Sequence, residues 1–210
     1  MSNSDPRLAL VTGIAVVVTC VVSITYGDYE QGFHAAFEPS AWAFSIWWVI
    51  FVASLVFATR VATVSGQQKA SAAHIIAYVM CTTWMLSHPR SPPAVSCTLL
   101  VLAAVCATIA THAAKGDGVS EGSTSLLAGW LIVAAWLSLA RTVPDSPLFN
   151  SEWTLLLATA SVCGAAIATG RPSMLLPVAV AAAAQPQVLA KLGPVVLSLS
   201  MVMIAWQVSW

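Results

Sequence analysis

The stretch that decides the fold runs from residue 37 to residue 51 and reads FEPSAWAFSIWWVIF. Pro39 and Ser40 suit the start of a helix, because proline fits the first turn and serine caps free amides. Three of the nine tryptophans fall in this stretch. Trp42 is expected near a membrane interface, and the rings after it lie roughly 3 to 9 Å deeper. The stretch therefore predicts the entry of a transmembrane helix.

The composition of the whole chain agrees with a membrane location. Of its 210 residues, 59% are hydrophobic and only 8% are charged, against roughly 25% charged residues in soluble domains. Eight basic residues balance eight acidic ones, so no basic field can hold a nucleic-acid backbone. The long, continuous apolar runs lack the alternation of barrel strands. We expect an all-α, polytopic transmembrane bundle in the lipid bilayer, with no nucleic-acid partner.

The chain contains enough apolar runs for seven or eight spans of about 20 residues each. Their expected bounds are 8–25, 41–60, 70–87, 94–114, 124–140, 153–169, 174–189 and 194–210. The seventh is the weakest because three prolines accompany it, so a kinked, re-entrant or partly spanning segment stays open there. Residues 1–25 lack a cleavage pattern and are expected to stay as the first helix. Basic residues favour the amino-terminal side by five to three, which predicts a cytoplasmic N-terminus.

Several functional classes are disfavoured by where polar residues fall. All acidic residues are expected in termini or loops, whereas a carboxylate-coupled transporter keeps an acid within its bundle. No lysine lies deep in a span to hold retinal, and no hydrolase motif is present. The five cysteines are isolated, and His34, His74, His88 and His112 do not share a helix face. We expect no enzyme activity and no metal site; haem ligation by one histidine stays an alternative.

Three motifs resemble those of one family. Residues 37–51 look like the second-helix signature of the tryptophan-rich sensory proteins (TspO/MBR), relatives of the mitochondrial translocator protein, in their longer branch. Trp84 resembles the third-helix tryptophan of that family, and LLAGWLIVA at 126–134 resembles its fifth-helix motif. Where the family has a second proline and two asparagines, this chain has Ser40, Cys81 and Ser138. These departures remove polar groups that could orient a ligand.

The resemblance implies a particular architecture and ligand class. Residues 1–140 would form a five-helix core, and residues 141–210 would add two or three helices to the same membrane domain. The loop at 26–40, which is rich in aromatic residues, would fold over the end of the bundle. In the family, the cavity under that loop receives tetrapyrroles or sterol-like lipids, often in a dimer.

The aromatic residues of three spans are the candidates for lining such a cavity. Phe44 and Trp47 are three residues apart and share a helix face, whereas Trp48 lies about 100° away and should face lipid or a neighbouring helix. The predicted pocket lies between the second, third and fifth spans, and its candidate ligand-binding residues are Trp42, Phe44, Trp47, Trp84 and Trp130.

Two functional hypotheses follow. In the first, the protein is a receptor or carrier-like protein with a sensory or regulatory role. It binds a flat hydrophobic small molecule, such as a porphyrin or haem, by stacking, and it requires no cofactor. In the second, it is a structural or regulatory membrane component that contacts protein partners, and its tryptophans are only interfacial anchors.

Small residues in the sixth span are suited to close helix packing. Ala160, Gly164 and Ala168 recur every four positions, and such residues let helices approach closely in lipid. We expect packing within the molecule at this face, with a homodimer interface as the alternative.

Overall fold

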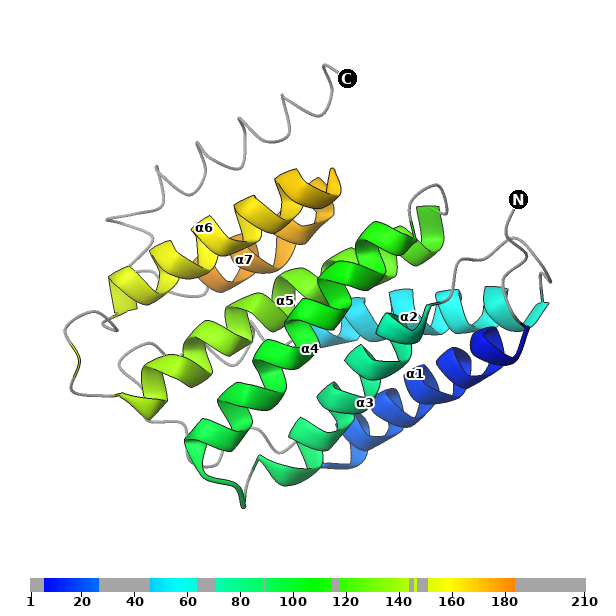
Figure 1. The fold of residues 1–210 in the computed structure, drawn as a ribbon, viewed down its shortest axis with the longest axis horizontal. Helices are drawn as coiled ribbons and strands as arrows, with labels where there is room; N and C mark the ends of the chain where they lie inside the picture. Colours follow the sequence, from blue (N-terminus) through cyan, green and yellow to red (C-terminus); the bar gives the residue numbers. More distant parts are fainter. Residues whose placement is uncertain are drawn as a thin grey trace.

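The computed structural model describes residues 6–26, 46–63, 71–88, 90–114, 118–143, 146 and 151–183, and in these ranges every regular element is a helix (Figure 1). The helices are α1 (Pro6–Tyr26), α2 (Ile46–Thr63), α3 (Ala72–Ser87), α4 (Pro93–Ala113), α5 (Gly118–Thr142), α6 (Ser151–Thr169), the 3₁₀ helix η3 (Pro172–Met174) and α7 (Leu175–Ala183). The predicted all-α fold is confirmed.

The predicted bounds agree within two residues for α1, α3, α4 and α6. The prediction for α5 is wrong at its start, since the helix begins at Gly118 and not at residue 124. The residues between are mostly small or polar and resemble a loop in sequence. The predicted loop over 26–40 and the span at 194–210 lie outside the described residues, except for Tyr26 at the end of α1.

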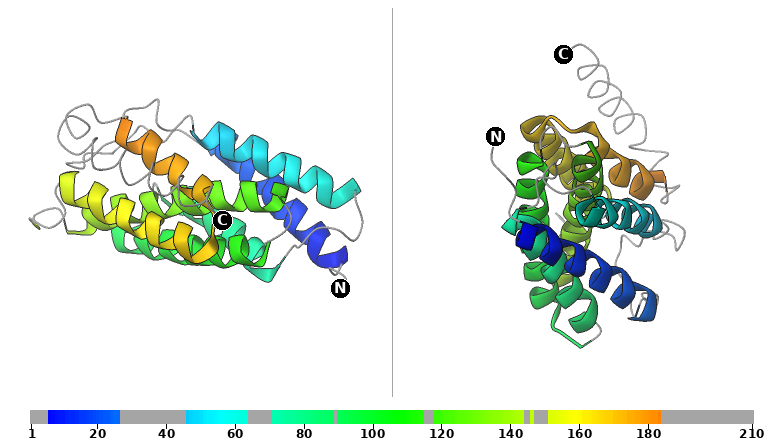
Figure 2. Two further views of the ribbon diagram at one scale, coloured as in Figure 1. Left: turned by 90° about the horizontal axis from the view of Figure 1, so that it is seen from above. Right: turned by 90° about the vertical axis from the view of Figure 1, so that its right-hand side faces the viewer.

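Helix α5 is the centre of the bundle. It packs against α2, α4, α6, η3 and α7, and Leu127, Trp130 and Leu131 on it are almost fully buried. Figure 1 shows α4 and α5 crossing the middle, with α1, α2 and α3 on one side and α6 and α7 on the other. Figure 2 shows the same separation from two further directions. The helices that follow α5 in sequence are thus packed onto the same core.

The outer surface of the bundle is apolar. In the described part, α4 and α5 are long and apolar enough to cross a membrane, and the other α-helices contribute shorter apolar segments. Large hydrophobic side chains point outward, among them Trp48 (61% exposed) and Val52 (59% exposed). An extended apolar surface of this kind is unfavourable in water and suits contact with lipid tails. The exposure of Trp48 confirms the orientation predicted for it.

The small-residue face of α6 points away from the core. Ala160, Gly164 and Ala168 are all exposed, and a methyl group added at Gly164 would meet nothing within 4 Å. No helix among the described residues covers this face, so the expected packing within the molecule is not found in that part of the chain and stays a prediction for the residues beyond 183. Helical spacing shows which residues share a face, but not which face the neighbouring helices cover.

Candidate functional site

Two of the predicted site residues meet at the interface of α2 and α5. Trp47 on α2 is 5% exposed and Trp130 on α5 is 2% exposed. Their ring centroids are 6.0 Å apart and the rings meet edge to face at 80°. Phe51, one turn along α2, stacks on Trp47 with centroids 5.3 Å apart and 24° between the planes. We call Trp47, Phe51 and Trp130 the aromatic cluster.

The other candidate residues are placed differently. Trp84 is buried on α3, and its ring lies 5.2 Å from that of His88, which follows α3. Trp42 and Phe44 lie outside the described residues. The structure thus brings Trp47 and Trp130 together, and a common pocket for all five residues stays a prediction.

Three buried hydroxyl groups meet between α2, α3 and α5. The Oγ of Ser54 lies 2.9 Å from the hydroxyl of Tyr78, and that hydroxyl lies 3.4 Å from the Oγ of Ser123. Ser123 donates to Ser54 at 3.3 Å and closes the triangle. Buried hydroxyls need such partners because an unpaired one costs free energy in apolar surroundings. We call these three residues the hydroxyl cluster. The sequence analysis did not single this cluster out, although polar side chains inside apolar spans could have indicated it.

The two clusters stand in register on antiparallel helices. Trp47 faces Trp130, and seven residues further along α2 Ser54 faces Ser123, which precedes Trp130 by seven residues on α5. Seven residues are about two helical turns, or about 10.5 Å. The α2–α5 interface therefore has an apolar aromatic level and a polar hydroxyl level.

A second polar contact joins α1 to α3. The hydroxyl of Thr19 lies 2.7 Å from that of Thr82 and 3.2 Å from the carbonyl oxygen of Tyr78, to which it can donate. Tyr78, whose phenol belongs to the hydroxyl cluster, is thus also held through its backbone carbonyl. Together the two contacts connect α1, α2, α3 and α5 through polar groups.

Glu121 corrects one expectation from the sequence. It lies in the first turn of α5, is 7% exposed, and forms an ion pair with Arg171 through Oε1 and Nη2. The expectation that all acidic residues lie outside the helices is wrong here, and it is also wrong for Glu152 in the first turn of α6. A carboxylate can be buried at this position because a cation fifty residues away neutralises it.

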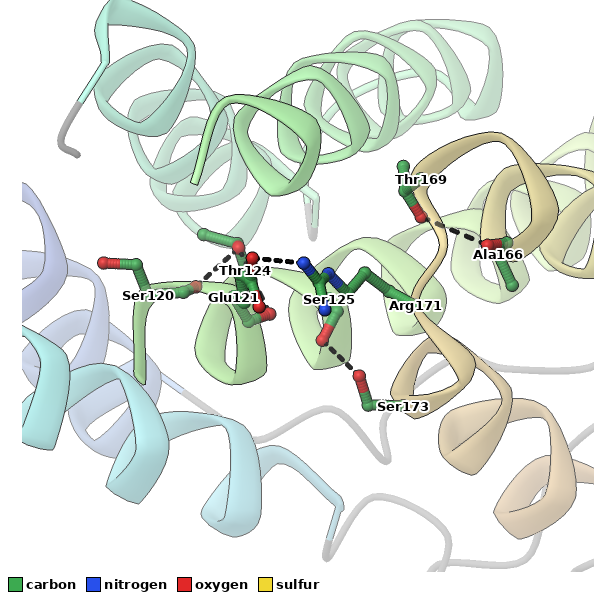
Figure 3. Close-up of polar contacts among 8 residues, drawn as sticks. All are labelled: Ser120, Glu121, Thr124, Ser125, Ala166, Thr169, Arg171 and Ser173. Atoms are coloured by element: carbon green, nitrogen blue, oxygen red, sulfur yellow. Dashed lines mark hydrogen bonds and ion pairs between the residues drawn. The ribbon is translucent and has the colours of Figure 1, made fainter. Parts of the chain in front are cut away.

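Glu121 begins a row of contacts between α5 and the segment that follows α6 (Figure 3). One turn on, the Oγ atoms of Ser125 and Ser173 are 2.6 Å apart. After a further turn, a methyl group at Gly129 would lie 2.2 Å from the carbonyl oxygen of Met174, so the two backbones touch. Spacing by four residues puts these positions on one face of α5, and we call this face the docking row.

The turn that delivers Arg171 to the docking row is specified by a glycine. Gly170 has a φ of 72°, which favours glycine. Its amide donates to the carbonyl of Ile167 at 3.2 Å, and the amide of Arg171 donates to that of Ala166 at 2.9 Å. This pair of bonds is a Schellman motif. It ends α6 and turns the chain back onto α5.

The described histidines have different surroundings. His74 is fully buried, stacks on Phe57 at 5.5 Å and accepts the Ser71 amide at Nδ1. Burial, followed by the charge of Arg141, lowers the pKa of His88. His112 is exposed on α4, and His34 lies outside the described residues. Within the described ranges, no three His, Cys, Asp or Glu side chains form a group that could hold a metal ion.

Comparison with known proteins adds one finding. A family model described as "TSPO-like protein" matches residues 7–184, a range that extends from α1 through α7. No curated protein and no solved structure matches the chain. The matched range includes α6 and α7 as well as the five helices of the predicted core.

Proposed function

Because the chain belongs to the TSPO-like family of helical membrane proteins, we propose that it is a receptor or carrier-like protein for a flat hydrophobic ligand. The ligand class is a tetrapyrrole or a sterol-like lipid, held without covalent chemistry, and the role is sensory or regulatory. The observation that carries this proposal is the contact of Trp47 with Trp130 across α2 and α5.

The aromatic cluster supports the proposal through its chemistry. Its three buried rings come from two helices and contact one another, and each aromatic contact contributes about 0.5–1.5 kcal/mol beyond the burial of area. The hydroxyl cluster lies two turns away on the same pair of helices, and its three groups satisfy one another. The aromatic level is therefore the part of this interface that suits a flat apolar molecule.

Titration of protoporphyrin into the purified protein, followed by quenching of tryptophan fluorescence, tests the proposal. Trp47→Leu keeps an apolar side chain but removes the stacking surface, so affinity should fall by about 1–2 kcal/mol, or roughly 5- to 30-fold. Trp48→Leu is the matched control, because Trp48 adjoins Trp47 but points outward. Equal affinities of the two variants, or no saturable binding by the parent protein, would contradict the proposal.

A protein-contact role is the second candidate. Trp48 and Trp153 are more than half exposed, as interfacial anchors would be, and the exposed face of Ala160, Gly164 and Ala168 could pack closely against another helix. In this role the protein is a structural or regulatory membrane component, and the same face would support a homodimer. Failure of porphyrin binding together with a stable dimer in detergent would favour it.

The proposed arrangement in the membrane is multi-pass with a cytoplasmic N-terminus. The ion pair of Glu121 with Arg171 supports the multi-pass arrangement, because the start of α5 and the turn after α6 lie at one end of the bundle. This is the arrangement expected if α5 and α6 cross in opposite directions. The orientation rests on the five-to-three bias of basic residues alone.

A further inference from the structure

A pocket of about 440 Å³ lies between α4, α5 and α6, apart from the aromatic cluster. Its lining includes Val101, Val105 and Ile109 of α4, Ala135 and Trp136 of α5, and Ser161 of α6. Trp136 follows Trp130 by six residues and therefore points about 120° away from it around α5. The pocket is thus on another face of α5 from the proposed ligand site.

The pocket is elongated along the helices. Its lining on α4 extends from Val101 to Ile109, which is about 12 Å at a rise of about 1.5 Å per residue. Two small residues that face the hollow, Ala104 and Ala135, are 6% and 8% exposed and leave space that larger side chains would fill. An occupant that fits this shape is long, narrow and parallel to α4 and α5.

The polar atoms of the lining already have partners inside the protein. The indole Nε1 of Trp136 donates to the Oγ of Ser161 at 3.0 Å, and the hydroxyl of Thr108 donates to the carbonyl of Ala104 at 2.8 Å. An occupant therefore needs no hydrogen-bonding group. A polar atom of the occupant would have no hydrogen-bond partner in the pocket.

The pocket opens on the lipid-facing surface of α4. Val101, Val105 and Ile109 form its outer edge and are 44%, 51% and 55% exposed. In a membrane protein this side is in contact with lipid tails. An occupant can enter sideways from the bilayer and needs no passage through the bundle.

We propose that this pocket binds one acyl chain of a bilayer phospholipid. The chain lies along α4 and α5, with its methylenes against Trp136 and over Ala104 and Ala135. A single hydrocarbon chain fits an elongated, apolar pocket whose polar atoms are all occupied, whereas a ligand with several polar groups does not. The proposal is independent of the function proposed above, since it uses a different face of α5.

Photolabelling in detergent micelles tests this proposal. The full-length protein, purified in detergent, receives a rising fraction of phosphatidylcholine with a diazirine midway along one acyl chain, and the labelled residues are mapped by mass spectrometry. A specific site gives labelling at Trp136 and Val105 that saturates at a low fraction of probe. Lipid that is only dissolved in the micelle gives labelling that rises in proportion to the probe, as expected at Val52 on α2.

Two variants fill the pocket from different sides. Val105→Trp fills it from the exposed edge and does not touch the buried core, and Ala135→Leu fills it from α5. Val79→Trp on α3 is the matched control, because Val79 is a similarly exposed valine (44%) on another helix. We expect both filling variants to lose the saturable labelling at Trp136 and the control to keep it.

The competing outcomes are distinct. Labelling at Trp136 that never saturates would show ordinary contact with lipid dissolved in the micelle and would overturn the proposal. Absence of labelling at Trp136 and Val105, with normal labelling at Val52, would show that another part of the chain or a second copy covers the pocket, and would overturn it too. Porphyrin binding is measured on the same samples, so a failure here is separate from a failure of the proposed function.

Discussion

At the scale of single residues, Gly129 has the least space of the described glycines. A methyl group there would lie 2.2 Å from the carbonyl oxygen of Met174, and 3.0 Å from its carbonyl carbon. The obstacle is backbone, which cannot rotate away as a flexible side chain can. The glycine of the fifth-helix motif is therefore required by the approach of η3, and not by a need for an unusual φ.

Gly129→Ala should lower the stability of the folded protein by about 1–3 kcal/mol, the usual cost of overpacking. Gly164→Ala is the control, since its methyl group would meet nothing within 4 Å and alanine favours the helix by roughly 0.5–1 kcal/mol. Thermal unfolding of both variants in detergent provides the measurement. A Gly129→Ala protein that melts at or above the parent temperature would show that η3 does not pack against α5 in this way.

His88 gives a prediction for the effect of pH. Its pKa is lowered by burial and, secondarily, by Arg141, so folding favours the neutral imidazole. The unfolded-state pKa is about 6.5; the stability that His88 provides is therefore complete above that value and is lost as the pH falls below it. The unfolding temperature should drop between about pH 7.5 and about pH 5.5.

The matching variants separate His88 from other groups. His88→Gln should reduce this drop, because the side chain no longer takes up a proton. His112→Gln, at an exposed position on α4, should leave it unchanged. If the drop is the same in His88→Gln as in the parent protein, another group causes it.

A third residue-scale prediction concerns haem. We expect stacking on tryptophan rings to hold a flat ring without an axial ligand, so His88→Ala should still shift the absorption spectrum of added haem. His88 is the informative choice because its ring lies 5.2 Å from that of Trp84. Loss of the spectral shift in this variant would instead identify an axial histidine.

At the scale of elements, the docking row joins the last described helices to the core. It combines an ion pair, a hydrogen bond between Ser125 and Ser173, and a backbone contact at Gly129, all on one face of α5. The Schellman motif at Gly170 sets the direction in which the chain leaves α6. These contacts make α5 the common partner of the helices before it and after it.

Arg171→Gln should destabilise the protein by about 1–3 kcal/mol, because it leaves Glu121 buried without its cation. This loss is smaller than the roughly 3–5 kcal/mol for fully buried pairs, since the side chain of Arg171 is 26% exposed. Adding Glu121→Gln to this variant should recover part of the loss, since the buried charge is then gone. Arg60→Gln, at an exposed position of α2, is the control, and melting curves that do not distinguish it from Arg171→Gln would contradict the role of the ion pair.

At the scale of the whole molecule, the ends of α5 are predicted to lie on opposite sides of the membrane. Its 25 residues span about 37 Å, which exceeds the hydrocarbon thickness of about 30 Å. His112 is exposed near the end of α4, close in sequence to the start of α5, and Val143 is exposed just after its end.

Cysteines introduced singly at these two positions, in a protein without the native cysteines, test this arrangement. In intact cells, a membrane-impermeant maleimide should label Val143→Cys, whereas His112→Cys should react only after the membrane is opened. The opposite pattern would place the N-terminus outside. Labelling of both positions in intact cells would contradict a spanning α5.

The sequence by itself determined the helical class, most helix bounds and the facing of single residues. Continuous apolar runs specify helices in lipid because every backbone amide must be bonded within its own segment. The angle of about 100° per residue places Trp47 and Trp48 on different faces, and the structure buries the first and exposes the second. The motifs at 37–51 and 126–134 were enough to indicate the family, which the match over residues 7–184 confirms.

Only the tertiary structure decided which faces meet. The sequence at the start of α5 resembles a loop. Its polar residues Glu121 and Ser125 are buried in a helix because Arg171 and Ser173, from the segment after α6, pair with them. The hydroxyl cluster depends on the register of two antiparallel helices, and the exposure of the small-residue face of α6 depends on where its neighbours lie. Helical periodicity is local and groups residues on a face, whereas the partner of that face is set by packing between segments far apart in the chain.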